Sequence, residues 1–185
     1  YCFMKKKALW IVLVLLVIAF LAYLYKIGGA ESYDVTMINN KGEEIGVIRL
    51  NETNAGVLLG INLRKLKPDG EHAIHIHEKA DCTPLDSFTN AGGHFNPTHV
   101  EHGMKNPKGY HAGDMPNIKP DKKGNSVTQI LNRKITLLEF DIDDRKSVFD
   151  RDGSAIVIHD GADDHMSQPA GAAVKRVACG VIKHK

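Results

Sequence analysis

The stretch AIHIHE, at residues 73–78, alternates isoleucine and histidine over the length of a short strand. Successive side chains of a β-strand point to opposite faces, so the pattern sends Ile74 and Ile76 to one side and His75 and His77 to the other. The isoleucines then face a core, and the two imidazoles are placed to hold one metal ion. A His-x-His pair alone is a weak signal, because it also occurs on surfaces by chance.

Strand-length runs rich in valine and isoleucine continue on both sides of this stretch, with turn residues between them. None shows a sustained helical period, so the pattern predicts an all-β sandwich or barrel. The eight predicted strands cover residues 33–38, 44–50, 56–66, 71–78, 126–131, 135–140, 154–159 and 176–182.

Two long stretches do not fit a ladder of strands: residues 80–123, the first loop, and residues 160–175, the second loop. Long loops in a compact domain are uncommon and are usually functional. The first loop holds four of the ten histidines of the chain. We expect a metal ion and a disulfide to order it.

The first loop carries a second group of candidate ligands, His94, His102, His111 and Asp114. Three imidazoles and one carboxylate suit zinc, with four ligands and no open position. Glycines directly before His94 and Asp114 would allow the backbone to approach its neighbours closely. The alternative is a solvated, histidine-rich loop, since spacing alone does not diagnose a zinc site.

His159 ends a predicted strand and opens the second loop. With His75 and His77 it would complete an imidazole-rich site suited to copper; the alternative is a histidine satisfied within the core. We assign no metal to the remaining histidines: His72, His99, His165 and His184.

The N-terminal thirty residues have the character of a targeting segment. Lys5, Lys6 and Lys7 precede an uncharged run at residues 8–25, which would span about 27 Å as a helix, close to the thickness of a bilayer core. The positive-inside rule places everything after Lys26 outside the cytoplasm. We expect residues 1–30 to be an uncleaved membrane anchor, or a signal peptide cleaved after Ala30 with a secreted product, and residues 31–185 to form one domain.

Cys82 and Cys179 are the only cysteines of that domain. Export favours a disulfide between them. Zinc ligation by their thiolates is the weaker alternative, because neither cysteine has a C-x-x-C partner.

The charge of the domain excludes one class of partner. Residues 1–30 hold four lysines and no acid, so the rest of the chain carries 20 basic against 22 acidic residues. A near-neutral domain lacks the basic footprint that phosphate binding needs, which argues against nucleic acid.

From about residue 33 to residue 182 the chain resembles the copper,zinc superoxide dismutases. Residues 73–78 are similar to the first signature of that family. Residues 93–97 (GHFNP), His102 and residues 111–114 (HAGD) are similar to its metal loop, and residues 176–182 (RVACGVI) to its C-terminal signature.

The resemblance implies a flattened, eight-stranded Greek-key β-barrel and the dismutation of superoxide. It implies that Arg176 supplies a fixed positive charge for the superoxide anion, that Asp163 links a copper histidine to a zinc histidine, and that His94 bridges the two metals. The implied copper ligands are His75, His77, His94 and His159, and the implied zinc ligands are His94, His102, His111 and Asp114.

Two departures from the family pattern bear on the active site. Residues 171–174 read GAAV where the family commonly has Gly-Asn-Ala-Gly, so the Val174 side chain could narrow the channel to copper or shift Arg176. Lys175 is the one lysine that aligns in the steering part of the second loop.

We therefore expect an exported enzyme that protects against superoxide outside the cytoplasm and contains one copper and one zinc per subunit. A homodimer is compatible with the sequence. The main alternative is a non-enzymatic, exported copper or zinc binding protein on the same fold. A zinc hydrolase ranks last, because four protein ligands leave no open zinc position.

Overall fold

The structure is a computed structural model that describes residues 10–20, 32–84, 87–173 and 175–183. The chain separates into two compact units, residues 1–31 and 32–185. In the first unit, residues 10–20 form an α-helix with exposed side chains. Among the described residues, no helix combines the length and apolar character that crossing a membrane requires. Residues 1–9 and 21–30 of the predicted targeting segment, with Lys5, Lys6 and Lys7, lie outside the described residues.

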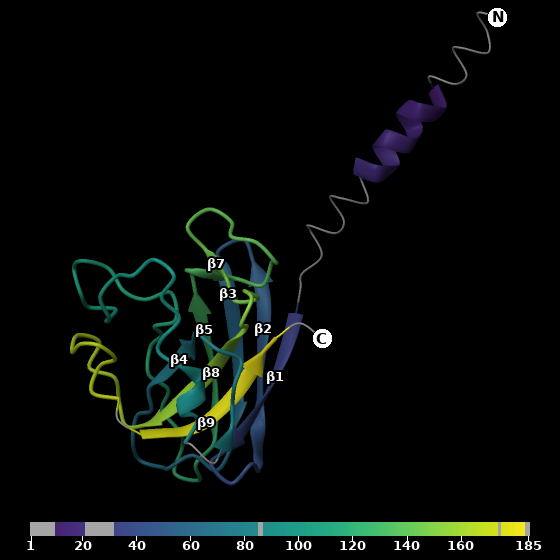
Figure 1. The fold of residues 1–185 in the computed structure, drawn as a ribbon. Helices are drawn as coiled ribbons and strands as arrows, with labels where there is room; N and C mark the ends of the chain where they lie inside the picture. The colour runs from purple at the N-terminus through teal and green to yellow at the C-terminus, as the bar shows by residue number, and fades with distance from the viewer. Residues whose placement is uncertain (1–9, 21–31, 85–86, 174, 184–185) are drawn as a thin grey trace, which may run out of the picture. The chain divides into compact units, whose positions relative to one another are not determined.

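Seven antiparallel strands of the second unit form one curled sheet (Figure 1), in the order β4-β8-β9-β1-β2-β3-β5. Two further short strands, β6 (Ile135–Thr136) and β7 (Lys146–Ser147), form a separate parallel pair. The strands of the sheet are β1 (Ser32–Asn39), β2 (Glu44–Thr53), β3 (Gly56–Leu63), β4 (Ile74–His77), β5 (Ser126–Asn132), β8 (Ser154–Asp160) and β9 (Lys175–Ile182).

One main hydrophobic core packs against the sheet. In β1, Val35 and Met37 are fully buried while Asp34 and Thr36 are exposed, as alternation predicts. Ile74 and Ile76 of β4 belong to the same core cluster. The predicted orientation of the AIHIHE stretch is therefore confirmed: its isoleucines face the core, and its histidines are buried on the other side among further histidines.

The all-β prediction is confirmed, but the predicted count of eight strands is wrong for the described residues. The predicted strand at residues 135–140 stops after Thr136, and β7 was not predicted. The physical reason is a side chain that replaces a neighbouring strand: Glu52 accepts hydrogen bonds from the Leu137 backbone N–H (2.6 Å) and the Thr136 hydroxyl (3.1 Å). Arg145 neutralises that carboxylate from the following turn, at 2.7 Å.

The first loop is also not purely a loop, because parts of it line the free edge of β4. Isolated antiparallel bridges join His72 to Ile118, His75 to Asp114 and His77 to His94. Pro116 lies between two of these bridge positions and has no N–H to donate, which prevents a continuous ladder. The sheet edge that carries the histidine pair is therefore covered by the segment that carries the other candidate ligands.

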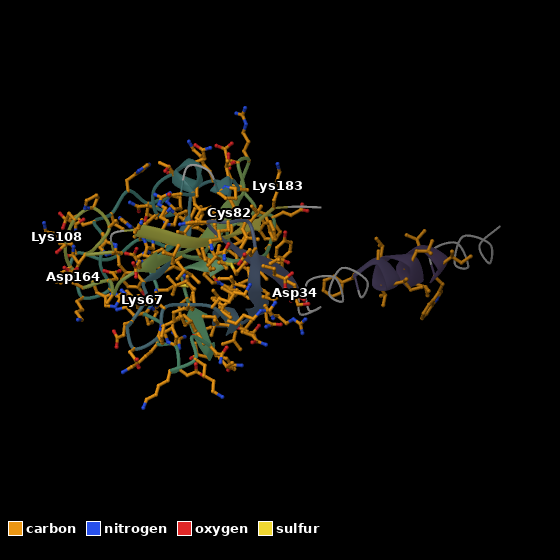
Figure 2. All side chains as sticks on the ribbon, turned by 90° about the horizontal axis from the view of Figure 1, so that it is seen from below. Asp34, Lys67, Cys82, Lys108, Asp164 and Lys183 are labelled. Atoms are coloured by element: carbon orange, nitrogen blue, oxygen red, sulfur yellow. A yellow bond between two sulfur atoms is a disulfide. The ribbon has the colours of Figure 1, made fainter. Side chains whose placement is uncertain are left out.

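The predicted disulfide between Cys82 and Cys179 is confirmed, and it excludes zinc ligation by these sulfurs. It ties the first loop to β9. Cys179 is fully buried in a small cluster with Phe88 of the first loop and Val157 of β8. Figure 2 shows Cys82 beside β9. The crosslink therefore anchors the start of the first loop against the sheet.

Replacing both cysteines by alanine should lower the free energy of unfolding of the metal-free domain by about 2–5 kcal/mol, because the bridge closes a long loop in the unfolded chain. Its cysteines are 97 residues apart. Urea denaturation in the presence of a chelator measures the change. Wild-type protein treated with a reductant keeps both sulfur atoms, so it serves as the control for the sulfur contacts that alanine removes, and it should show a similar loss. An unchanged midpoint in both samples contradicts the prediction.

Candidate metal centre

Four buried histidines from three parts of the chain form the first group. His75 and His77 come from β4, His159 from the end of β8, and His94 from the first loop. Each histidine contributes one ring nitrogen, and these four nitrogen atoms all lie within 4.8 Å of one another. The rings of His75 and His94 are 3.9 Å apart between centroids, and those of His75 and His159 are 5.1 Å apart. The pattern predicted His75 and His77 on one face, and the structure brings His159 to them.

One ring nitrogen of His75 and one of His77 is already held by the protein. His77 Nδ1 donates to the Gly92 carbonyl at 2.9 Å, and His75 Nε2 donates to Asp163 Oδ2 at 2.9 Å. These bonds leave His75 Nδ1 and His77 Nε2 with lone pairs that face the group. Neither has a hydrogen-bond partner among the described residues, and the same is true of His94 Nε2 and both ring nitrogens of His159.

Buried polar atoms without partners are rare and costly, so this group has the properties of a site that a ligand completes. Burial favours the neutral ring: with the help of the neighbouring His75 it lowers the pKa of His159 to about 2. Burial is also the main cause that lowers the pKa of His94 to about 4. Neutral imidazole nitrogens are the form that binds copper, and the donor set therefore fits a copper ion.

The second group consists of His94, His102, His111 and Asp114, and all four are buried. Asp114 Oδ1 lies 2.9 Å from His94 Nδ1, 3.0 Å from His102 Nδ1 and 3.3 Å from His111 Nδ1. Zinc ligands at 2.0–2.1 Å in a tetrahedron stand about 3.3 Å from one another. The distances from Asp114 Oδ1 to the three imidazoles are close to that spacing, so this donor set fits a zinc ion.

His94 belongs to both groups through its two ring nitrogens: Nδ1 faces Asp114 and Nε2 faces the first group. Glycines allow the loop to reach this point. Gly92 has φ +76°, and a Cβ there would crowd the Glu78 side chain; a Cβ on Gly113 would overlap the Ile76 carbonyl. The close backbone approach predicted for the glycines before His94 and Asp114 is therefore confirmed at Gly113.

Asp163, in the second loop, connects the two groups. Its Oδ2 accepts from His75 Nε2 at 2.9 Å, and its Oδ1 accepts from His102 Nε2 at 3.1 Å. Burial opposes ionisation, but the hydrogen bonds from His102 and His75 outweigh it and hold the pKa of Asp163 well below its usual range. Burial likewise opposes a proton on His102, but hydrogen bonds to Asp114 and Asp163 raise its pKa to about 9.

Arg176, the first residue of the C-terminal signature, is fixed beside the first group. Its guanidinium donates to the carbonyls of Phe88 and Gly92, each at 2.6 Å. Gly92 is the residue whose carbonyl also accepts from His77 Nδ1. A cation is thus held next to the imidazoles by backbone alone. Val174 lies outside the described residues, so its effect on a channel stays a prediction.

The three described histidines that were not assigned to a metal, His72, His99 and His165, lie outside both groups. His72 is buried, with its two ring nitrogens 2.7 Å and 3.0 Å from the backbone carbonyls of His159 and Lys67. His99 is exposed, His165 is near Asp163 at 3.3 Å, and His184 is outside the described residues. Two further residues, Asn117 and Gln168, were not predicted: their amides contact the backbones of Asp163 and His102. An isolated amide gives no sequence signal of such a contact.

A curled antiparallel sheet with two buried metal-ligand groups that share one histidine defines a class of dinuclear metalloproteins. The family model described as copper/zinc superoxide dismutase (SODC) matches residues 44–182. The chain therefore belongs to the copper/zinc superoxide dismutase family.

Relatives agree with this assignment. "Superoxide dismutase [Cu-Zn] 2" of Aquifex aeolicus is 51% identical over 147 residues, which are 80% of this chain and 84% of the relative. "Superoxide dismutase-like protein YojM" of Bacillus subtilis is 37% identical over 154 residues, 83% of this chain and 76% of the relative.

Solved structures show the same fold. A SOD-like protein from Bacillus subtilis superposes with a TM-score of 0.75 at 33% identity, covering 80% of this chain and 97% of that one. The Cu/Zn superoxide dismutase from Brucella abortus gives a TM-score of 0.64 at 26% identity, covering 82% and 99%.

Asp114→Ala should abolish tight zinc binding, because Asp114 is the only carboxylate of the second group and also accepts backbone N–H bonds from Gly103 and His111, each at 3.0 Å. Since metal binding energy is also folding energy, proteolysis of the first loop should accelerate. Asp121→Ala is the matched control: Asp121 accepts the N–H groups of Lys123 and Asn125 in the same loop but contacts no candidate ligand. Equal zinc content in the two variants would show that Asp114 is not a ligand.

Proposed function

We propose that this chain dismutates superoxide, converting two superoxide anions and two protons to dioxygen and hydrogen peroxide. The observation that supports this most directly is the complete first group, in which all four positions are histidines with ring nitrogens that lack hydrogen-bond partners within the part of the chain that the structure describes. In this proposal copper is held by His75, His77, His94 and His159, and zinc by His94, His102, His111 and Asp114.

When bound, copper supplies one-electron redox chemistry, which zinc lacks. The protein holds each donor in one orientation. Gly92 and Asp163 fix the tautomers of His77 and His75, as outer hydrogen bonds commonly do around metals. His94 is the histidine shared by the two groups: its Nδ1 lies 2.9 Å from Asp114 Oδ1, and its Nε2 has no hydrogen-bond partner in the described chain. We assign the proton transfer of the reaction to this shared histidine.

Arg176 is proposed to attract and orient the superoxide anion. A guanidinium has five N–H donors in a rigid fork, and the backbone carbonyls of Phe88, Thr89 and Gly92 take only part of that capacity. Because the group is half-buried, its charge is screened less than that of an exposed lysine. A fixed cation beside a site raises the local concentration of an anionic substrate.

A non-enzymatic metal binding protein is the second candidate, because a fold does not fix an activity. One observation favours it: the Bacillus subtilis relative carries the name "superoxide dismutase-like". The full histidine set of this chain favours the enzyme instead.

We also propose that residues 31–185 act outside the cytoplasm, after a segment at residues 1–30 that either anchors the chain through residues 8–25 or is cleaved. The disulfide supports an oxidising compartment. A homodimer is proposed on the family membership alone.

If the chain is a dismutase, His159→Ala and Arg176→Ala should fail in different ways. His159→Ala should lose copper and activity together, because it removes a ligand. Arg176→Ala should keep copper but lower the second-order rate about 10-fold or more, because steering charges act on association. Copper content and superoxide decay, measured on the same samples, separate the two effects.

The rate of the wild type should fall as ionic strength rises, and that of Arg176→Ala should fall less. Arg64→Ala is the control, because Arg64 is exposed, directly follows β3 and pairs with Glu44; this variant should retain the wild-type salt dependence. If the copper-loaded wild type consumes superoxide no faster than free copper, the binding-protein candidate replaces the enzyme.

A further inference from the structure

Two side-chain amides that are not metal ligands join the loops on which the second group depends. Asn117, in the first loop, contacts the backbone of Asp163 in the second loop. Its Nδ2 donates to the Asp163 carbonyl at 2.9 Å, and its Oδ1 accepts from the Asp163 N–H at 2.9 Å. The amide therefore satisfies both backbone groups of the residue that links the two metal groups, much as a neighbouring strand would.

Gln168, in the second loop, makes the same contact in the opposite direction. Its Oε1 accepts from the His102 N–H at 2.9 Å, and its Nε2 donates to the His102 carbonyl at 2.9 Å. Each loop thus contributes one amide that binds the backbone of a metal-site residue in the other loop.

The two residues held in this way also contact each other: Asp163 Oδ1 accepts from His102 Nε2 at 3.1 Å, and both side chains are fully buried. The chain Asn117–Asp163–His102–Gln168 therefore crosses between the loops three times. The adjoining backbones also meet, since the Lys105 N–H donates to the His165 carbonyl at 3.2 Å. In Figure 2, Lys108 of the first loop and Asp164 of the second loop lie on the same side of the domain.

We infer that Asn117 and Gln168 are positioning residues, a reciprocal pair of latches that fix His102 and Asp163 and so set how long zinc is retained. Both loops lie mostly outside the hydrophobic core, so hydrogen bonds must supply much of their order. Outer partners of metal ligands commonly change metal affinity by about 10–100-fold when removed. The inference rests on the zinc ligands proposed above and does not require turnover of superoxide.

The latch needs a donor and an acceptor in one planar group, which an amide has and a carboxylate lacks. Gln168→Glu keeps the shape and the acceptor but turns an oxygen lone pair toward the His102 carbonyl. If Gln168 only fills space, glutamate should replace it; if it is a latch, glutamate should fail as alanine does.

The test is the rate at which zinc leaves the full chain loaded with copper and zinc, followed with a chromophoric zinc chelator. Asn117→Ala and Gln168→Ala should each release zinc about 10-fold faster than the wild type, and Gln168→Glu should not restore the wild-type rate. The zinc release rate of the double variant should rise by less than the product of the two single-variant increases, because both amides hold the same pair of loops together.

Asn39→Ala is the control. Asn39, at the end of β1, also uses both ends of its amide, but within one turn: its Oδ1 accepts from the Lys41 and Glu43 N–H groups at 2.9 Å and 3.1 Å, and its Nδ2 donates to Glu43 Oε2 at 3.0 Å. The zinc release rate of this control should stay within about twofold of the wild-type rate, which is a much smaller change than the one expected for a residue that holds a metal ligand.

Limited proteolysis adds a signature that a general loss of stability would not produce. Gln168→Ala should make the first loop more sensitive to protease, and Asn117→Ala should do the same to the second loop. In each case the sensitive loop is the one that does not carry the substitution. If the loaded variants release zinc at the wild-type rate, the positioning role of Asn117 and Gln168 is wrong, while the proposed zinc ligands stand. Cleavage confined to the substituted loop would have the same consequence. A wild-type chain that holds no zinc would overturn the ligand set and the latches together.

Discussion

Buried imidazole nitrogens without hydrogen-bond partners are the constraint on which the rest of the structure depends. His75 Nδ1, His77 Nε2, His94 Nε2 and both ring nitrogens of His159 are in this state among the described residues. Burial of such atoms is unfavourable unless something completes them, and it keeps the rings neutral. A metal ion held by these nitrogens would remove that cost, and its binding energy would also stabilise the folded domain.

The sheet and the loops share the task of holding these atoms in place. Strands β4 and β8 are adjacent and antiparallel, which brings His75 and His77 near His159. The first loop then covers the free edge of β4 and adds His94, while the disulfide anchors the start of that loop to β9. The carbonyl of Gly92 receives both His77 and Arg176, so one short backbone segment orients a proposed copper ligand and places the cation beside it.

Sequence pattern predicted the parts that depend on local periodicity. Alternation in residues 73–78 placed the isoleucines and histidines on the correct faces, and seven of the eight predicted strands overlap strands of the sheet. It failed where a distant side chain replaced a strand, as Glu52 does at Leu137, and where a proline-interrupted segment lines β4. The sharing of His94 and the link through Asp163 came from family resemblance, because they depend on three-dimensional convergence. Asn117 and Gln168 gave no signal, since an amide is common and its partners are distant in sequence.

We propose that one histidine, His94, serves two metal ions through its two ring nitrogens. Anomalous X-ray diffraction at the copper and zinc absorption edges, from crystals of the chain loaded with both metals, tests it most directly. We predict a copper peak among His75, His77, His94 and His159, and a zinc peak among His94, His102, His111 and Asp114. A single peak, or a metal bound away from His94, would contradict the account.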